Sequence, residues 1–254
     1  MEPHVLEVLD LHKVYSNGVY ALRGLSFVVK KGEIYGLIGP NGSGKTTTLR
    51  IIAGLVKPTK GLIRIAGFDI VKKPEITKQY IGYLPEEADV YYRLTGLEHI
   101  EFYAKLYGLD SEAVEYGVKL SGLGDRLYDE AGTYSKGMKR RLLLAITLMR
   151  KPMLAILDEP TSGLDVQASL KVRDIIKQFV RESSSSVVIS SHNMLEIEYL
   201  ANRIGLIYKG KLVFEGAPAD VLKKTNSSNL EEAFVKIIES SGVENGFDHE
   251  STYT

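Results

Sequence analysis

A glycine-rich stretch, GPNGSGKT at residues 39–46, is the part of the chain whose residue types point most directly to chemistry. It matches G-x-x-x-x-G-K-[ST], a loop whose backbone N–H groups surround a phosphate chain. Lys45 supplies a positive charge for the β- and γ-phosphates, and the Thr46 hydroxyl is suited to Mg²⁺. A glycine-rich turn without chemistry is the alternative, but an apolar strand at 34–38 precedes the loop and a helix at 46–53 is expected after it. The pattern therefore predicts binding of a nucleoside triphosphate.

Two acids, Asp158 and Glu159, directly follow a predicted apolar strand at 153–157. Ligands of α/β sheets bind beyond the carboxyl ends of the strands. We expect Asp158 to hold Mg²⁺, directly or through water, and Glu159 to take a proton from the attacking water. The alternative is that these two acids merely begin a solvated loop. The phosphate loop in the same chain disfavours this alternative.

His192 follows Glu159 after a segment that reads as one strand–helix–strand crossover. Apolar residues at 172–180 recur with helical spacing, and 187–189 reads as the next strand. A parallel crossover places His192 at the tip of a nearby strand, facing the same crevice. A lone histidine is more often structural, yet beside these motifs a role in hydrolysis is favoured.

The remaining pattern predicts an α/β fold. Residues 4–30 read as antiparallel strands around a turn at 16–18, and 85–150 is mainly helical. Further strands are expected at 62–65 and 81–84, and a hairpin at 204–208 and 212–215. We therefore predict a P-loop NTPase with a mainly parallel core sheet, an N-terminal antiparallel β layer and an inserted helical subdomain. The expected boundaries are 1–225 for the nucleotide-binding domain, about 86–150 for the insertion, and 226–254 for a C-terminal helix and mobile polar tail.

The amino-acid composition limits the classes of binding partner that we expect for this chain. The 32 basic and 32 acidic side chains balance, and a nucleic-acid binder usually carries a basic surplus, so no nucleic-acid partner is expected. The absence of cysteine excludes disulfides and thiolate metal sites. No secretory signal is visible at the N-terminus, and the longest apolar run, 142–149, is less than half a bilayer span. We expect a chain that does not itself cross a membrane.

Together these residues resemble the ATP-binding cassette (ABC) family, specifically the nucleotide-binding subunit of an ABC transporter, over roughly residues 5–220. The resemblance makes 39–46 the Walker A motif, ends Walker B at Asp158, and identifies 162–165 as the D-loop and His192 as the switch histidine. Tyr15 occupies the place of the aromatic residue that stacks on adenine, although a tyrosine packed in the β layer is the alternative.

Two motifs depart from the family pattern. The signature reads YSKGM at 134–138, where Ser135 and Gly137 match the common LSGGQ form but Lys136 and Met138 do not. Ser135 could merely cap the following helix, whereas in the family this turn closes over the γ-phosphate held by the opposite subunit. Glu86 stands where the family usually has the Q-loop glutamine. An ionised glutamate only accepts hydrogen bonds, yet it can ligate Mg²⁺ or orient water.

The site residues implied by the motifs and the resemblance fall into four groups. They are catalytic Glu159 and His192; ATP-binding Tyr15, Gly39, Pro40, Asn41, Gly42, Ser43, Gly44, Lys45, Thr46 and Thr47; ATP-binding in trans Ser135, Gly137 and Asp165; and Mg²⁺-binding Thr46, Asp158 and Glu86.

The resemblance implies an ATPase that works as a pair, expected to be a homodimer, which closes on ATP and reopens after hydrolysis to power transport. It also implies an integral membrane subunit on a separate chain and a cytoplasmic location on the inner face of the cell membrane. Residues 81–109 resemble ABC-2-type exporters. Nine of the 15 tyrosines lie between Tyr80 and Tyr134, either as a partner surface or as the core of a small subdomain.

Two rival interpretations of the function stay open. One is a soluble cassette ATPase of translation or repair, and the other is a regulatory cassette that binds ATP without useful hydrolysis. A GTPase is disfavoured because no N-K-x-D motif is present.

Overall fold

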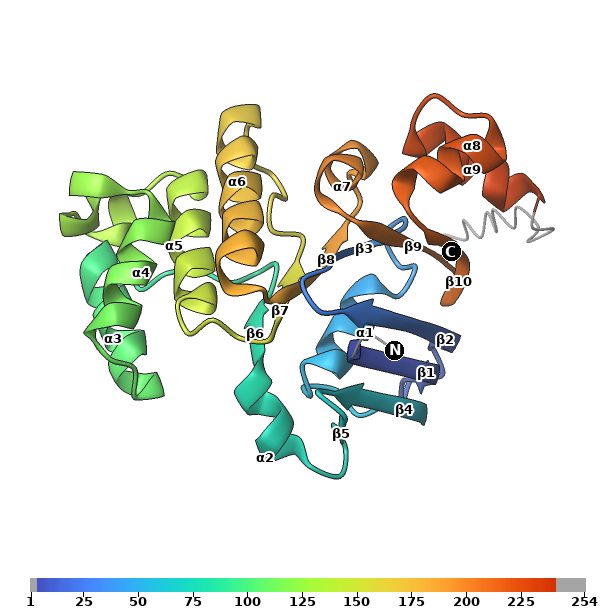
Figure 1. The fold of residues 1–254 in the computed structure, drawn as a ribbon, viewed down its shortest axis with the longest axis horizontal. Helices are drawn as coiled ribbons and strands as arrows, with labels where there is room; N and C mark the ends of the chain where they lie inside the picture. Colours follow the sequence, from blue (N-terminus) through green and yellow to red (C-terminus); the bar gives the residue numbers. More distant parts are fainter. Residues whose placement is uncertain (1–3, 241–254) are drawn as a thin grey trace, which may run out of the picture.

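The computed structural model describes residues 4–240, so the predicted polar tail from Gly242 lies outside the described residues. Two β-sheets lie side by side, with most helices on the far side of the larger sheet (Figure 1). The smaller sheet has the strand order β2-β1-β4-β5, and the larger has the order β10-β9-β3-β8-β7-β6. The predicted α/β class is confirmed.

The smaller sheet is the predicted N-terminal antiparallel layer. Its main strands are β1 (His4–Val14) and β2 (Tyr20–Lys30), joined by the expected turn, with β4 (Lys60–Ile65) and β5 (Phe68–Asp69) on the other edge of β1. The segment predicted as short strands thus forms two long strands, and irregularities in their pairing interrupt the alternation of buried and exposed side chains in β1.

The larger sheet is parallel except for its last strand. The parallel strands are β3 (Ile34–Ile38), β6 (Ile81–Leu84), β7 (Leu154–Asp158), β8 (Ser186–Ser191) and β9 (Arg203–Tyr208). Antiparallel β10 (Lys211–Gly216) completes the expected hairpin. Every residue of β3, β7 and β8 is buried, as is typical of parallel strands covered on both faces. Strand β7 begins one residue later than predicted, because Met153 is still exposed.

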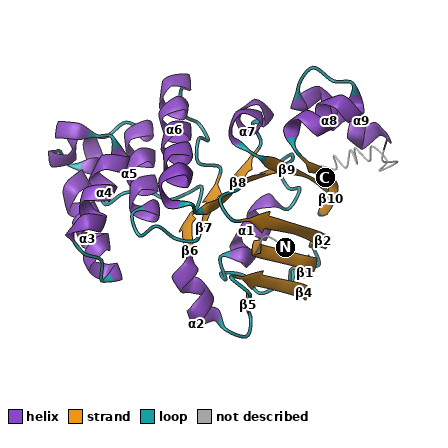
Figure 2. Cartoon of the chain, in the orientation of Figure 1, coloured by secondary structure: helices purple, strands orange, loops and turns teal. Residues whose placement is uncertain are grey.

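The helices divide between the two faces of the larger sheet and a separate helical region. Helix α1 (Lys45–Ile52) lies between the sheets, where its apolar residues share one core with both. The opposite face packs against α5 (Lys136–Leu148), α6 (Val166–Ser183) and α7 (Met194–Leu200). Figure 2 shows α3 (Gly96–Tyr107) and α4 (Ser111–Ser121) grouped with α5 at the edge farthest from the smaller sheet.

Short elements complete the described fold. They are helix α2 (Pro74–Thr77), the 3₁₀ turns Lys78–Tyr80, Gly124–Tyr128 and Ala131–Thr133, and the C-terminal helices α8 (Pro218–Thr225) and α9 (Leu230–Ser240). The predicted helical segment therefore lies between β6 and β7. The proposed domain boundaries stay a prediction. The arrangement leaves the carboxyl ends of β3, β7 and β8 side by side, and the functional residues gather there.

Candidate active site

The phosphate loop connects buried β3 to α1, as the strand–loop–helix pattern predicts. Gly44 caps the helix with φ +112°, and a Cβ at this position would lie 2.8 Å from the Ala21 carbonyl oxygen. Only glycine adopts this conformation in this space without strain. The loop therefore brings its backbone N–H groups to the start of α1, where the helix dipole also favours an anion.

Lys45 lies at the first turn of α1, and its side chain is almost fully buried. Its Nζ atom donates to the carbonyl oxygens of Gly39 (2.7 Å) and Pro40 (3.2 Å) and lies 3.7 Å from Glu159 Oε1. Burial lowers the pKa of Lys45, while the charge of Glu159 acts in the opposite direction. The ammonium is thus held at the loop by acceptors that a phosphate group would replace.

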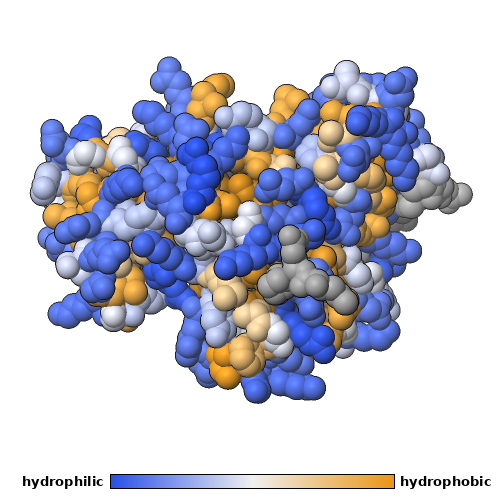
Figure 3. Space-filling model, viewed as in Figure 1, coloured by the Kyte–Doolittle hydropathy of each residue, from blue (hydrophilic) through white to orange (hydrophobic). Residues whose placement is uncertain are grey.

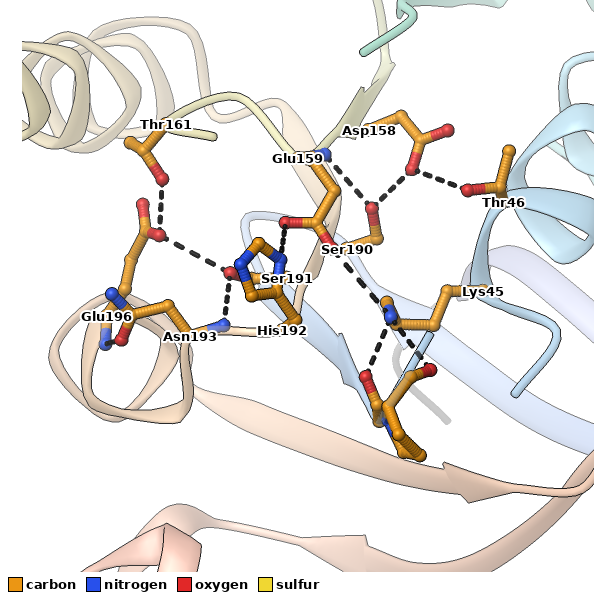
Figure 4. A network of polar contacts seen from close by, with 12 residues as sticks. Lys45, Thr46, Asp158, Glu159, Thr161, Ser190, Ser191, His192, Asn193 and Glu196 are labelled. Carbon is orange, nitrogen blue, oxygen red and sulfur yellow. Dashed lines mark hydrogen bonds and ion pairs between the residues drawn. The ribbon is translucent and has the colours of Figure 1, made fainter. Parts of the chain in front are cut away.

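Asp158 is the last residue of β7 and forms a short chain of polar contacts (Figure 4). Thr46 Oγ1 donates to Asp158 Oδ1 at 3.3 Å, and Ser190 Oγ donates to the same oxygen at 2.5 Å. Burial raises the pKa of Asp158, which the hydrogen bonds from Ser190 and Thr46 oppose and the charge of Glu86 reinforces. The structure thus joins two of the three predicted Mg²⁺ ligands, Thr46 and Asp158.

These two oxygen donors fit Mg²⁺ chemically. Mg²⁺ prefers hard oxygen ligands and keeps several waters, so a hydroxyl and one carboxylate beside a phosphate suffice. Glu86, the third predicted ligand, lines a pocket over the phosphate loop together with Thr46. Within residues 4–240 no group of three or more histidines or acids could hold a metal ion by itself.

Glu159 and His192 form a direct pair, whereas the crossover predicted only that both face the same crevice. His192 follows the last residue of β8, and its Nδ1 lies 2.8 Å from Glu159 Oε2. The carboxylate is 7% exposed and the imidazole 53%, so the pair reaches from the buried edge of the sheet to solvent. Because an ionised carboxylate only accepts, Nδ1 carries the proton in this contact.

The backbone of Glu159 is in an unusual conformation. Its φ of +47° falls in the left-handed region, which is uncommon for residues other than glycine. The Glu159 N–H donates to the Ser190 carbonyl (3.2 Å) and to Ser190 Oγ (3.1 Å), and these bonds hold the strained turn. Such strain concentrates at functional sites. Ser190 was missed at the sequence level, and its only signal is its place two residues before His192.

A pocket of about 290 Å³ opens over the phosphate loop. Its lining includes the predicted Tyr15, Asn41, Gly42, Gly44, Lys45, Thr46, Thr47, Glu86 and Glu159, together with Val19, Tyr20 and Ala21. Tyr15 is half-buried and belongs to this lining, with its hydroxyl 3.2 Å from Thr47 Oγ1. Gly39, Pro40 and Ser43 complete the same loop behind it.

Glu86 is held in place through its backbone. Arg140, on α5, donates from Nη1 to the Pro85 carbonyl (3.2 Å) and from Nη2 to the Glu86 carbonyl (2.7 Å). Arg140 is almost fully buried, and burial lowers its pKa while the charge of Glu86 opposes this. Sequence analysis missed Arg140, because its only signal is a basic residue in the helix after the signature. The contact ties the loop at Glu86 to the signature helix.

The signature and D-loop residues lie together but outside this pocket. Ser135 caps α5 by accepting from the Met138 N–H (3.3 Å), and Asp165 caps α6 by accepting from the Ala168 N–H (2.8 Å). A Cβ on Gly137 would lie 2.6 Å from the Ala168 Cβ, so glycine allows the two helices to meet. None of the three predicted trans residues lines the pocket over the phosphate loop of the same chain.

Comparisons with known proteins agree with this geometry. The ABC transporter family matches residues 22–162, more than half of the chain. The linearmycin resistance ATP-binding protein LnrL of Bacillus subtilis is 37% identical over 93% of this chain and 79% of its own length. The bacitracin transport ATP-binding protein BcrA of Bacillus licheniformis is 39% identical over 89% of this chain and 74% of its own. A solved ATP-binding subunit of an ABC transporter superposes with a TM-score of 0.81 and 30% identity, covering 92% of this chain and 99% of that one.

Proposed function

The chain belongs to the ATP-binding subunits of ABC transporters, which hydrolyse ATP to power transport, and we propose that it does so with the residues gathered at the phosphate loop. The observation that carries the proposal is the Glu159 carboxylate, which lies between Lys45 and His192. An acid in this position faces both the cation that holds the terminal phosphates and a partly exposed imidazole.

Each side chain has a distinct task in this proposal. Lys45 and the loop N–H groups bind the phosphates, and Glu159 accepts a proton from the attacking water. His192 orients that carboxylate through its Nδ1–H. Thr46 and Asp158 would hold Mg²⁺, which would supply positive charge to balance the phosphate oxygens. Because phosphoryl transfer depends mainly on positioning and electrostatics, a preorganised pair such as Glu159–His192 suits the reaction.

We propose further that two copies of the chain face head to tail. The pocket over the phosphate loop lacks Ser135, Gly137 and Asp165, which form a separate cluster at the starts of α5 and α6. A second copy would bring its own cluster over the γ-phosphate, where the N-terminus of α5 favours an anion. ATP would favour this closed pair and ADP would not, so hydrolysis would reopen it.

The experiment that tests both points uses Glu159→Gln in the full chain. We expect hydrolysis to fall by roughly 10²-fold or more, the scale of a general base, while ATP binding persists. With ATP and Mg²⁺ the variant should sediment as a dimer, and with ADP as a monomer. Glu182→Gln, an exposed acid on α6, is the control and should hydrolyse normally. Full turnover by the Glu159 variant would move the base elsewhere, and a monomer at saturating ATP would exclude the pair.

We propose that a membrane-embedded subunit docks on the tyrosine-rich region. A cavity of about 280 Å³ between β6, α3 and α5 is lined by Tyr83, Tyr103, Tyr107 and Arg150, among others. Arg150 donates to the carbonyls of Lys78 and Gln79, which holds this rim in place. Both earlier interpretations of the tyrosines have support, because Tyr134 is buried in the core whereas Tyr91, Tyr92, Tyr107 and Tyr128 are exposed.

The partner would work at the inner face of the membrane, and the linearmycin resistance protein among the relatives supports export as the direction. No helix within residues 4–240 is long and apolar enough to cross a bilayer. Figure 3 shows hydrophobic residues scattered among hydrophilic ones on the face that it draws. Isolation of the chain from native membranes with its bound proteins tests the proposal. Recovery of the chain without any membrane protein would contradict it.

A further inference from the structure

A second buried carboxylate lies next to the site and has no part in the mechanism above. Glu196, on α7, is four residues beyond His192 and only 2% exposed. Acids are almost never buried so completely without a specific partner. Figure 4 shows Glu196 pointing from its helix towards the loop that follows Glu159.

The partners of Glu196 come from two functional segments. Thr161 Oγ1 donates a short hydrogen bond to Glu196 Oε2, and Ser191 Oγ lies 3.4 Å from the same oxygen. Thr161 precedes the D-loop residues 162–165, while Ser191 immediately precedes His192. One carboxylate thus contacts both the residue before the D-loop and the residue before the switch histidine.

The capping pattern of α7 indicates that Glu196 is committed to this contact. Asn193 caps the helix by accepting from the Glu196 N–H (3.1 Å). A glutamate at this third helical position commonly bonds back to the cap residue's N–H, as Glu98 does to Thr95 (2.7 Å) in α3. In α7 the Asn193 N–H instead donates to Ser191 Oγ (3.0 Å), which leaves the Glu196 carboxylate to Thr161.

We propose that Glu196 is a positioning residue, which couples the D-loop to the switch histidine through Thr161 and Ser191. The D-loop ends at Asp165, which would face the second copy, and His192 holds Glu159 within the same copy. A carboxylate bonded to both segments would fix the position of the trans contact relative to that of the catalytic acid. This inference rests on the proposed role of Glu159 and deepens it.

The electrostatic surroundings agree with a constrained acid. Burial raises the pKa of Glu196, and the hydrogen bond from Thr161 and the charge of Arg173 on α6 oppose that shift. Glu196 Oε1 and Arg173 Nε are both buried without a hydrogen-bond partner in the described part of the chain. Thr161 therefore donates the closer of the two hydroxyl contacts to this carboxylate, the other being the 3.4 Å contact of Ser191.

The test compares kinetics of full-length variants. Glu196→Gln and Thr161→Val should each lower kcat by about tenfold, the worth of one charge-assisted hydrogen bond, and leave the KM for ATP within about twofold. The double variant should be no worse than either single one, because the two residues share one contact. Thr161→Ser keeps the hydroxyl and should retain activity. Glu98→Gln, at the matching position of α3, should affect stability without changing kcat.

Hydrogen exchange of the nucleotide-free chain gives a readout that does not depend on hydrolysis. In Glu196→Gln, amides at 161–166 should exchange several-fold faster, while those of α1 and β7 keep the wild-type rate. Unchanged kcat together with unchanged exchange at 161–166 would overturn the positioning role. A wild-type chain that hydrolyses no ATP would instead refute the proposed function, and exchange would still decide whether Glu196 orders the D-loop.

Discussion

The edge of the sheet at the phosphate loop and the signature cluster at the starts of α5 and α6 differ in what they achieve within one chain. At the sheet edge, Lys45, Asp158, Glu159 and His192 already contact one another or shared partners. In the signature cluster, the side chains of Ser135 and Asp165 accept hydrogen bonds from backbone N–H groups of their own helices. In the first region the side chains are already arranged for chemistry. The second region consists of two helix N-termini, which Ser135 and Asp165 cap.

This difference predicts which residues should affect nucleotide binding and which should affect turnover. Nearly all predicted cis ligands line or adjoin one pocket, so a single chain should suffice to bind ATP. Ser135, Gly137 and Asp165 of the signature cluster do not line that pocket, so the role in turnover proposed for them would require a second chain. Variants of the two regions should therefore have different phenotypes, and the following experiments test that separation.

The largest effect is expected from Lys45→Ala. Two charge-assisted hydrogen bonds to phosphate, each worth about 1.5–3 kcal/mol, would be lost, so ATP affinity should fall on the order of 10³-fold. Calorimetric titration of the purified chain measures the change. Lys60→Ala, an exposed lysine on β4 paired with Asp10, should bind ATP normally. Near-normal binding by the Lys45 variant would refute the phosphate-loop assignment.

Ser135→Ala should separate turnover from binding. Loss of one hydrogen bond to the γ-phosphate across the pair should lower kcat by roughly 10–100-fold, while the isolated chain keeps its ATP affinity. Loss of the helix cap should also cost about 1 kcal/mol of stability. Asp110→Ala removes the cap of α4 in the same way and is the matched control for stability. Equal turnover in the two variants would show that Ser135 is only a cap.

Tyr15→Ala tests whether the rim of the pocket belongs to the binding region. Base stacking on an aromatic ring is worth about 1–3 kcal/mol, and we expect a value at the low end because the ring is only half-buried, or roughly a tenfold weaker ATP affinity. Tyr15→Phe keeps the ring, loses only the contact to Thr47, and should bind almost as wild type. If the alanine variant binds ATP as tightly as wild type, Tyr15 has a packing role instead.

The smallest effect is expected from Ser190→Ala. Loss of the donor to Asp158 and of the acceptor for the Glu159 N–H should cost about 1 kcal/mol, so the Mg²⁺ concentration for half-maximal hydrolysis should rise by roughly fivefold. Ser186→Ala, on the same strand, loses bonds to Lys30 and Gly32 far from the site. That control should lose stability without a change in Mg²⁺ dependence, and identical Mg²⁺ titrations for both variants would remove Ser190 from the site.

Residue patterns alone predicted much of this architecture, because apolar runs and glycine-rich loops act locally. The strand at Ile34–Ile38, the helix after the phosphate loop and the crossover to His192 all follow from periodicity and turn chemistry. Some element boundaries differ from the prediction by a residue or two. Strand β7, for example, begins after the exposed Met153. His192 and Glu159 were expected to face the same crevice, because parallel strands end at the same edge, and the structure adds their direct contact.

The sequence by itself determined the family, the α/β fold and the residue types that bind phosphate, since each depends on a short local pattern. Only the tertiary structure decided which polar groups complete the site. Ser190 supports Asp158, Arg140 holds the loop at Glu86, and Glu196 bonds Thr161. Apart from Ser190, which lies near His192, these residues carry no motif, because their roles come from burial and from contacts between segments that are distant along the chain. Such contacts exist only once the sheet has brought the ends of its strands together.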